Sequence, residues 1–272
     1  MAMTAPFDTH LARLEAWFEA VPAAAVALSG GVDSSLVAFV ARRQLGGSRT
    51  TAYIAVSPSL KGVDLEVATE FCGDHDIRLV EIGTAELDDP DYAANPVDRC
   101  FFCKTNLYAE LSGQLPGDGS VWMLSGTNRD DLGDWRPGLK AATASGVRSP
   151  LAECEIDKQV VRALARRFSL ACWDRPASPC LASRIPYGQP VTRGKLRRIE
   201  AGETVMNELG FPVVRVRHHE GRAVVEVPRE RLAELAGRGR EIKARLTAVG
   251  FRRVELDAEG FVSGRLNRAV VR

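Results

Sequence analysis

Short apolar runs alternate with longer helical patterns along the first part of the chain. The runs that predict strands are Ala23–Leu28, Thr50–Val56, Arg78–Ile82 and Val121–Leu124. Helical patterns stand between them, as over Asp64–His75. Strands that alternate with helices in this way form a parallel sheet with helices on both faces. We therefore expect an α/β fold whose ligands bind beyond the carboxyl ends of the strands.

A proline-rich segment separates this pattern from a second one. A helix that Asp157 is expected to cap runs through Phe168, and the prolines that follow are Pro176, Pro179, Pro186 and Pro190. The elements expected beyond them are a helix over Lys195–Leu209, two strands over Val213–Arg217 and Ala223–Val227, and a helix over Arg229–Leu246 with an interruption at Gly237–Gly239. We therefore expect a larger α/β domain over residues 1–186 and a smaller mixed α/β domain over residues 187–272.

The turn after the first predicted strand is rich in glycine and serine. Its residues are Ser29, Gly30, Gly31, Val32, Asp33, Ser34 and Ser35, and a helical pattern follows at once. Glycine lets backbone N–H groups close around an anion, and a helix N-terminus adds partial positive charge. The Walker A pattern would place a lysine at the start of that helix, and none occurs there. The turn instead resembles the PP-loop of the N-type ATP pyrophosphatases, which cleave ATP between its α and β phosphates.

A second turn of small residues, Ser125–Asn128, follows the last strand predicted in the larger domain. Because ligands bind beyond the carboxyl ends of parallel strands, we expect Gly126 and Thr127 to lie near the nucleotide. Asp33 in the first turn has two interpretations. Its carboxylate can help to hold a metal-bound pyrophosphate, or it can cap the helix that begins there. Neither interpretation excludes the other.

The net charge is only +1, but the charge is unevenly distributed. From Tyr187 onward the chain has 18 Lys or Arg against 11 Asp or Glu, whereas the preceding residues have 18 against 24. A basic C-terminal region favours anionic partners, either nucleic acid or small phosphorylated or carboxylated molecules. No apolar stretch approaches the roughly 20 residues of a membrane span, and the N-terminus lacks a signal-peptide pattern. We expect a cytoplasmic protein without membrane contacts.

The six cysteines fall into two groups. In a cytosolic chain thiols stay reduced, which favours metal binding or catalysis for any that cluster. Cys100 and Cys103 have the two-residue gap that lets two thiolates bind one metal centre, although a redox pair or two unrelated thiols would also fit. Cys180 lies in a loop with Arg184 four residues later, and core packing explains it poorly. The cysteines expected in the core are Cys72, Cys154 and Cys172.

Together these motifs closely resemble the LarE family of ATP-dependent sulfur transferases, and the resemblance covers nearly the whole chain. The family makes the pyridinium bisthiocarboxylic mononucleotide precursor of the nickel-pincer cofactor. Besides the glycine turn, the segments that resemble it are Asp98–Lys104, Gly126–Asp131, Asp134–Gly138, Cys180–Gly188 and Arg215–His218. The resemblance implies a PP-loop ATP pyrophosphatase domain, of the adenine nucleotide alpha hydrolase-like fold, in which ATP and Mg²⁺ bind at the glycine turn.

The number of cysteines distinguishes two forms of this family. One form has only the loop cysteine, which gives up its own sulfur, and the other form has three cysteines. This sequence matches the second form, which implies a [4Fe-4S] cluster held by Cys100, Cys103 and Cys180, with one iron left to carry an extra sulfide. Three thiolates with an open corner suit a cluster that hands over sulfur, whereas structural zinc sites are normally closed by four ligands. A zinc site with a nearby fourth ligand is the alternative.

The resemblance also implies a reaction and a set of site residues. A carboxylate of pyridinium-3,5-dicarboxylic acid mononucleotide would attack the α-phosphorus of ATP, and sulfide would then displace AMP to give a thiocarboxylate, twice per molecule. The expected catalytic residues are Cys180, Asp33 and Arg184. The expected substrate-binding residues are Asp134, Arg136, Arg184, Arg215 and Arg217. Guanidinium groups bind phosphate and carboxylate bidentately, although arginines on an exposed strand are also ordinary surface residues.

Three other functions compete with this hypothesis. A PP-loop tRNA thiolation enzyme would explain the basic C-terminal region. An amide-forming NAD or GMP synthetase would need no loop cysteine, and a non-catalytic iron-sulfur carrier would use nucleotide only as a switch. The sequence favours the sulfur transferase. Its expected partners are the small anionic mononucleotide and a sulfide source or sulfur-donor protein, without nucleic acid, and it is expected to form a homo-oligomer.

Overall fold

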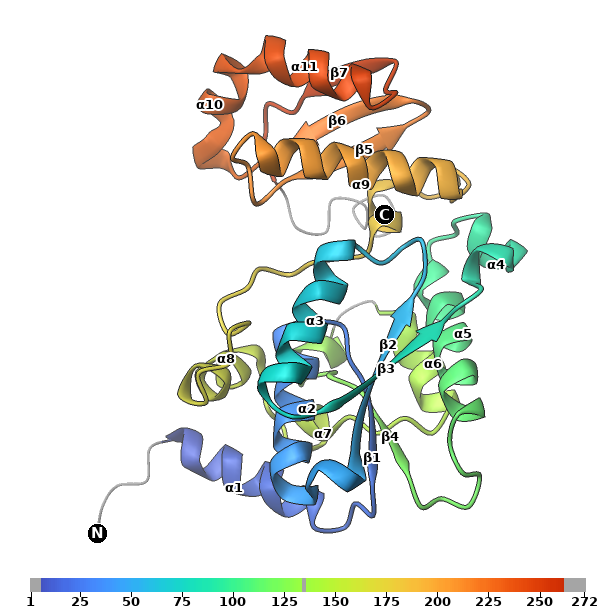
Figure 1. Cartoon of the computed structure of the whole chain (residues 1–272), viewed down its shortest axis with the longest axis vertical. Coiled ribbons are helices and arrows are strands. Elements are labelled where there is room, and N and C mark those ends of the chain that lie inside the picture. Colours follow the sequence, from blue (N-terminus) through green and yellow to red (C-terminus); the bar gives the residue numbers. More distant parts are fainter. Residues whose placement is uncertain (1–5, 134–135, 262–272) are drawn as a thin grey trace. The chain divides into compact units, whose positions relative to one another are not determined.

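The computed structural model describes residues 6–133 and 136–261 (Figure 1). Within these ranges the chain divides into two compact units. Unit 1 comprises the residues up to Glu86 together with Cys100–Ser178, and unit 2 comprises Leu87–Arg99 together with the residues from Pro179 onward. Each unit has its own apolar core. The predicted domain boundary between residues 186 and 187 stays a prediction.

A four-stranded parallel sheet forms the centre of unit 1. Its strands are β1 (Ala24–Ala27), β2 (Thr50–Val56), β3 (Arg78–Gly83) and β4 (Trp122–Leu124), in the order β3-β2-β1-β4. In the two central pairings Val26 of β1 lies opposite Ala52 on one side and Leu124 on the other. The chain leaves β1 toward β2 and later returns to β4 on its other side. The crevice of such a sheet lies at this point, beyond the carboxyl end of β1.

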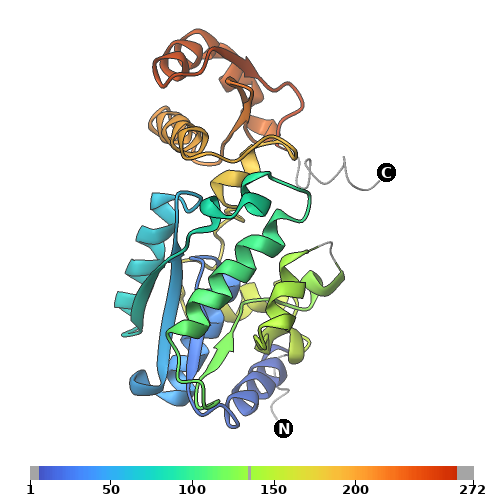
Figure 2. The same ribbon diagram turned by 90° about the vertical axis from the view of Figure 1, so that its right-hand side faces the viewer.

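Helices cover both faces of this sheet, which confirms the predicted α/β fold (Figure 1). The helices are α1 (Pro6–Phe18), α2 (Val32–Leu45), α3 (Gly62–Asp74), α5 (Arg99–Gly113), α6 (Gly138–Ala144), α7 (Pro150–Glu153) and α8 (Lys158–Arg167). Ala24 and Val26 of β1 pack with α2, α3 and α8, whereas Ala25 and Ala27 pack with α5 and α6. In the turned view the green helix α5 lies in front of the sheet (Figure 2). Successive residues of β1 face opposite sides of the sheet, because side chains alternate along a strand with a period of two residues.

Unit 2 is a small mixed α/β unit, as predicted. Its sheet joins β5 (Arg215–His219) and β6 (Arg222–Glu226) as an antiparallel hairpin and adds β7 (Arg253–Leu256) parallel to β6. Its helices are α4 (Pro90–Ala93), α9 (Arg193–Glu208), α10 (Leu232–Gly237) and α11 (Gly239–Ala248). The predicted interruption between α10 and α11 is confirmed. The hairpin turns at Glu220 and Gly221, which both have positive φ.

Asn95 connects the two stretches of unit 2, Leu87–Arg99 and the residues from Pro179 onward, by hydrogen bonds. The residue is fully buried and has a φ of 60°, an uncommon value for a residue other than glycine. Its Nδ2 donates hydrogen bonds to the carbonyl oxygens of Pro186 at 2.7 Å and Gln189 at 2.9 Å. Arg99 donates to Asn95 Oδ1 and to the carbonyl oxygen of Ala182. Leu87–Arg99 therefore holds the backbone that follows Cys180.

None of the helices within residues 6–133 and 136–261 is long and apolar enough to cross a membrane.

Candidate functional site

The glycine turn lies between the end of β1 and the start of α2, as predicted. Gly30 has a φ of 70°, and a Cβ added there would lie 2.9 Å from the carbonyl oxygen of Asp64. Both the backbone conformation and the space around it therefore require glycine. Gly31 is the N-cap of α2, and among residues 6–133 and 136–261 no side chain caps this helix end. The first N–H groups of α2 thus remain available to an anion.

Serine side chains fix the shape of this turn. Ser34 Oγ accepts a hydrogen bond from the Ser29 N–H at 3.1 Å and donates one to the Gly31 carbonyl oxygen at 3.1 Å. The hydroxyl groups of Ser29 and Ser34 also lie 3.1 Å apart. Ser35 follows in the core of unit 1 with 1% of its surface exposed. The turn is therefore ordered by its own side chains before any ligand enters.

The second small-residue turn packs directly against the first. A Cβ on Gly126 would lie 2.5 Å from the Ser34 backbone nitrogen and 2.8 Å from its Cα. Ser125 Oγ donates a hydrogen bond to Thr127 Oγ1 at 3.1 Å, which orders the turn internally. The structure therefore brings Gly126 and Thr127 to the glycine turn, as expected from their place at the end of β4. Their contact with ATP stays a prediction.

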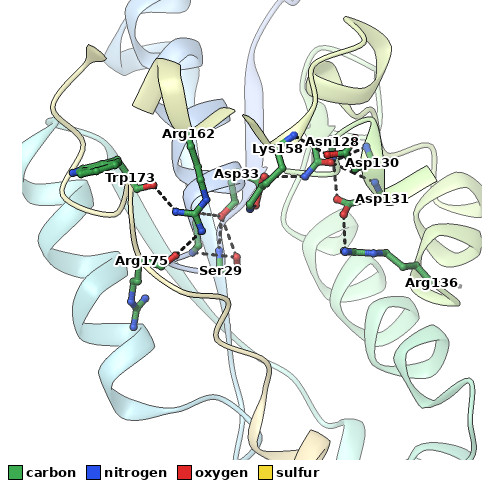
Figure 3. A network of polar contacts seen from close by, with 12 residues as sticks. Ser29, Asp33, Asn128, Asp130, Asp131, Arg136, Lys158, Arg162, Trp173 and Arg175 are labelled. Atoms are coloured by element: carbon green, nitrogen blue, oxygen red, sulfur yellow. Dashed lines mark hydrogen bonds and ion pairs between the residues drawn. The ribbon is translucent and has the colours of Figure 1, made fainter. Parts of the chain in front are cut away.

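Asp33 is held by contacts from distant parts of the chain (Figure 3). Its Oδ1 accepts a hydrogen bond from Asn128 Nδ2 at 3.0 Å, and its Oδ2 forms an ion pair with the ammonium group of Lys158. Asp33 lies in the first turn of α2, beyond the N-cap position that Gly31 occupies. Sequence reasoning missed Lys158, because only the fold brings it to the glycine turn. The predicted role of Asp33 in holding a metal stays a prediction.

Asn128 organises an acidic turn beside this pair. Its Oδ1 accepts a hydrogen bond from the Asp130 N–H at 2.9 Å, and its own N–H donates to Asp131 Oδ2 at 3.0 Å. Asp131 also pairs with Arg136 at 2.6 Å. Burial raises the pKa of the Asp131 carboxyl, and the hydrogen bond from Asn128 and the charge of Arg136 act in the opposite direction. Of the two residues predicted in this segment, Arg136 lies next to the turn and Asp134 lies outside the described residues.

Arg175 connects the glycine turn to the segment that leads toward Cys180. Its Nη1 donates a hydrogen bond to the Gly30 carbonyl oxygen at 3.1 Å, and its Nη2 pairs with the buried Asp64 carboxylate at 2.7 Å. Arg162 donates to the carbonyl oxygens of Trp173 and Arg175 (Figure 3). Sequence reasoning missed both arginines. No local pattern marks them, because their acceptors lie between 11 and 145 residues away in the chain.

The cysteines of the expected cluster are carried by both units. Cys100 and Cys103 lie three residues apart in the first turns of α5, so they share one face of the helix in unit 1. Cys180 begins a short 3₁₀ turn in unit 2 and is partly exposed. None of the six cysteines, all of which are described, forms a disulfide. Within the described ranges no three His, Cys, Asp or Glu side chains form a group that could hold a metal ion.

The other three cysteines are core residues of unit 1, which confirms their predicted role. Cys72, Cys154 and Cys172 are each less than 5% exposed and pack within its main apolar cluster. Burial raises the pKa of Cys72 and of Cys154 to about 11, and it raises the pKa of Cys172 as well. A thiol with a raised pKa is a poor metal ligand and a poor nucleophile. Burial therefore separates the same two groups of cysteines as the sequence, since Cys100 is exposed and Cys103 and Cys180 are partly exposed.

The loop of Cys180 is fixed by Arg184. This residue is 1% exposed, and its guanidinium group binds both carboxylate oxygens of Glu203, at 2.7 and 3.1 Å. Its Nη1 donates to the carbonyl oxygens of Pro179 at 2.8 Å and Cys180 at 3.3 Å. Glu203 also accepts the Val216 N–H. The arginine therefore joins the backbone on both sides of Cys180 to α9 and β5.

Two further predicted arginines of unit 2 lie close to Arg184. Arg217 pairs with the buried Glu226 at 2.6 Å and donates to the Ser183 carbonyl oxygen at 3.4 Å. Arg215 stacks on Phe261, with its guanidinium carbon 3.9 Å from the ring centre. Burial lowers the pKa of Arg215 to about 10, and the charges of Arg184 and Arg217 act in the same direction. The structure thus groups the three arginines into one cluster beside the Cys180 loop, in which Glu203 and Glu226 balance two of the three positive charges.

Comparison with known proteins gives matches over part and over nearly all of the chain. Residues 18–101 match the protein family described as asparagine synthase. The chain is 34% identical over 263 residues to pyridinium-3,5-bisthiocarboxylic acid mononucleotide synthase of Lactiplantibacillus plantarum, which covers 97% of this chain and 95% of that protein. It is also 40% identical over 268 residues to the uncharacterized protein slr1717 of Synechocystis sp., with 97% of this chain and 99% of that protein covered. An uncharacterized protein of Methanocaldococcus jannaschii, MJ0830, is 24% identical over 234 residues, which cover 86% of this chain and 88% of that protein.

Proposed function

Because the chain belongs to the LarE family, the family of pyridinium-3,5-bisthiocarboxylic acid mononucleotide synthase, we propose that it acts on pyridinium-3,5-dicarboxylic acid mononucleotide. It is an ATP-dependent sulfur transferase with a PP-loop domain, and its family serves nickel-pincer cofactor biosynthesis. In the proposed reaction the enzyme converts both carboxylates of the substrate into thiocarboxylates. Each conversion consumes one ATP and releases AMP and pyrophosphate.

The first step is the activation of a substrate carboxylate at the glycine turn. A carboxylate oxygen attacks the α-phosphorus of ATP, the bond to the bridging oxygen breaks, and pyrophosphate leaves from the acyl adenylate. The N-terminus of α2 supports this assignment, because its first N–H groups can donate to phosphate oxygens, and the hydrogen bonds within the turn from Ser29 to Ser34 fix the backbone that leads into it. We assign Asp33, in the first turn of α2, the contact with Mg²⁺ carried by the nucleotide.

The arginine cluster of unit 2 is the observation that carries the substrate assignment. Arg215 has its pKa lowered by burial and by Arg184 and Arg217, so the cluster holds positive charge that a bound anion would stabilise. The Cys180 loop lies beside it, since Arg184 binds the carbonyl oxygen of Cys180. A mononucleotide with a phosphate and carboxylates is the kind of anion that the remaining positive charge would attract. Arg184 and Arg217 already bind Glu203 and Glu226, so we assign Arg215 the most direct contact with the substrate.

We propose an iron-sulfur cluster as the sulfur donor, on the ligand chemistry of three thiols and not on a metal site formed by the described residues. Cys100 and Cys103 share one face of α5 and reach its surface, Cys180 is partly exposed, and thiolates are the ligands that such clusters prefer. When bound to these three thiolates, a [4Fe-4S] cluster would supply a sulfide from its fourth iron. Cys180 would then keep its own sulfur between turnovers. We also propose a cytoplasmic homo-oligomer that receives sulfide from a small-molecule source or from a donor protein.

Metal analysis of protein purified without oxygen tests this proposal. We expect about four irons per chain, with a similar amount of acid-labile sulfide. Cys180→Ala should lose iron, whereas Cys72→Ala should keep it, because Cys72 lies in the core of unit 1. The purified enzyme should form AMP and thiocarboxylate from ATP and the dicarboxylate mononucleotide. Iron-free protein that turns over once and leaves Cys180 without its sulfur would overturn the cluster in favour of a sacrificial cysteine.

A further inference from the structure

The small sheet of unit 2 carries a row of basic side chains near its hairpin turn. His219 of β5 pairs with Arg222 of β6, and Arg222 pairs with Arg253 of β7. Residues that pair directly across neighbouring strands lie on the same face of a sheet. The opposite face belongs to the apolar core of unit 2, to which Val216 and Val225 contribute. The basic row therefore lies on the face that is turned away from this core.

This row is unfavourable unless other charges balance it. Neighbouring strands lie about 4.8 Å apart, and like charges directly opposite one another destabilise a sheet. Glu255 balances one charge, since both of its carboxylate oxygens lie 3.1 Å from Arg222 Nη1. Within residues 6–133 and 136–261 neither Arg252 nor Arg253 pairs with a carboxylate. Two neighbouring guanidinium groups thus keep their positive charge.

The basic side chains line a pocket of about 550 Å³ in unit 2. Its lining residues are Gln189, His219, Glu220, Gly221, Arg222, Arg252 and Arg253. The lining thus has three arginines against one glutamate, so its net charge is positive. Pockets that bind small molecules have volumes of about 300–1,000 Å³. The size and the charge of this pocket both suit a small anion.

The backbone of the pocket is fixed by contacts within unit 2. Gly221 has a φ of 91°, and its carbonyl oxygen accepts a hydrogen bond from the Arg252 N–H at 2.8 Å. A Cβ added to Gly221 would lie 3.6 Å from Arg252 Cδ, so the stem of this arginine lies along the hairpin turn. The carbonyl oxygen of Gln189 accepts a hydrogen bond from Asn95 at 2.9 Å. A ligand therefore does not have to order this backbone when it binds.

Two polar groups of the lining indicate that a partner is missing. Gln189 Oε1 is buried and accepts no hydrogen bond from the part of the chain that the structure describes, whereas buried polar groups normally have a partner. Burial lowers the pKa of the His219 imidazole, and the charges of Arg222 and Arg217 lower it further, while two glutamates act in the opposite direction. A ligand with negative charge and a hydroxyl or amino group would explain both observations.

We propose that this pocket binds a phosphate group, separately from the glycine turn and from the arginine cluster around Arg215. Four residues of extended strand, about 13 Å, separate Arg215 from His219 on β5. Arg252 and Arg253 would bind the phosphate oxygens, because guanidinium groups donate paired hydrogen bonds to phosphate, and His219 adds a ring N–H. The phosphate group can come from inorganic phosphate or from a nucleoside monophosphate, whose hydroxyl groups would also suit Gln189. The proposal goes beyond the proposed function and does not depend on it.

NMR signals of the histidine rings in the full chain locate the binding. The chain has four histidines, all within the described ranges, and His219 is the one that lines the pocket. Its signal, assigned with His219→Gln, should shift and saturate during titration with inorganic phosphate. The signals of His10 and His75 in unit 1 should not follow the same curve. Chloride at the same ionic strength should not produce this shift, because screening alone does not saturate a site.

Arg253→Gln removes one positive charge from the row. We expect phosphate binding, followed at the His219 signal, to weaken by about 5- to 20-fold, between the effects of an exposed and of a buried charge pair. Arg253→Lys keeps the charge and should recover part of the affinity. Arg240→Gln is the matched control, because Arg240 is exposed on α11 and does not line the pocket. The side chain of Arg253 is also exposed, so all three variants should fold like the wild type.

A titration with AMP in place of phosphate distinguishes the two sources of the phosphate group. Tighter binding of AMP than of phosphate, with the difference lost in Gln189→Ala, would support a nucleoside monophosphate. Equal or tighter binding of phosphate would support the free anion. The inference is wrong if neither probe saturates the His219 signal, if chloride shifts it equally, or if Arg253→Gln binds phosphate as tightly as the wild type. The proposed function would still stand, since iron content and thiocarboxylate formation are measured separately.

Discussion

Arg175 donates a hydrogen bond to the carbonyl oxygen of Gly30, so the segment that leads into the Cys180 loop also holds the glycine turn. The same guanidinium group pairs with Asp64, which is 3% exposed. One side chain thus fixes the peptide group of a residue with positive φ and neutralises a buried carboxylate. The shape of the glycine turn depends on a residue 145 positions away in the chain.

Replacing Arg175 should affect stability and nucleotide binding together. In Arg175→Ala the Asp64 carboxylate loses its charged partner, and the free energy of unfolding should fall by about 2–4 kcal/mol. The affinity for Mg-ATP should fall as well, because Gly30 is no longer held. Urea denaturation and calorimetry measure the two effects. Arg78→Ala on the exposed edge of β3 is the control and should change neither. Unchanged ATP affinity in Arg175→Ala would contradict a role in shaping the turn.

Gly126 should tolerate no side chain. In Gly126→Ala the added Cβ would lie 2.5 Å from the Ser34 nitrogen, so the start of α2 must move. We expect a loss of about 1–3 kcal/mol in stability and a clear loss of Mg-ATP affinity. Gly73→Ala is the control, because a Cβ there meets nothing within 4 Å and the residue lies in α3. Its stability should equal that of the wild type or exceed it by up to about 1 kcal/mol. Normal ATP binding by Gly126→Ala would contradict the close packing of the two turns.

The two groups of cysteines should differ in their rate of alkylation. At pH 8 a thiol with a pKa of about 11 is only about 0.1% thiolate, and burial further slows its modification. Iodoacetamide should therefore modify the metal-free native protein first at Cys100, Cys103 and Cys180. Cys72 and Cys154 should react only after unfolding. Peptide mass spectrometry measures the order. If the cluster is reconstituted, its three thiolates should become protected, and continued labelling of Cys180 would contradict its role as a ligand.

His218 should make unit 2 sensitive to acid. The residue is 2% exposed, its Nε2 lies 3.1 Å from Arg198 Nη1, and burial followed by the charge of Arg198 lowers its pKa to about 4. The unfolded chain therefore takes up a proton below pH 6.5 that the folded chain does not accept until about pH 4. Stability is fully retained above pH 6.5 and falls as the pH decreases toward 4, by at most about 3 kcal/mol.

A variant without this imidazole isolates its contribution. His218→Gln should lose less stability than the wild type between pH 6.5 and pH 4.5, whatever its stability at pH 7. Urea denaturation at several pH values measures the difference in slope. His10→Gln on α1 of unit 1 serves as the control and should follow the wild type. Parallel curves for His218→Gln and the wild type would show that another group causes the acid sensitivity.

Local patterns predicted the parts of the site that are contiguous in the chain. Apolar periodicity and helix capping involve neighbouring residues. These patterns therefore predicted the strand before Ser29, the helix after it and the cap at Asp157. The meeting of Gly126 with the glycine turn also followed, since parallel strands end at one edge of a sheet. Cys100 and Cys103 fall on one helix face by spacing alone.

Contacts between distant residues could not be predicted in this way. Lys158 and Arg175 reach the glycine turn only because α8 and the segment after it pack next to α2. The buried partners of Arg184 and Arg217 likewise depend on how α9 and β6 are placed. An arginine on a strand has the same local pattern whether it faces solvent, a substrate or a buried carboxylate. Such pairs need the tertiary structure.

The course of the chain through unit 2 limits how the protein can be divided. Because Leu87–Arg99 belongs to unit 2, the backbone passes between the units three times. A fragment that starts at Pro179 would lack Asn95, and the carbonyl oxygens of Pro186 and Gln189 would lose their donor. Cleavage at a single junction would leave the fragments joined by noncovalent contacts. Truncation at a single junction therefore cannot separate the two units, because each unit is built from two stretches of the chain.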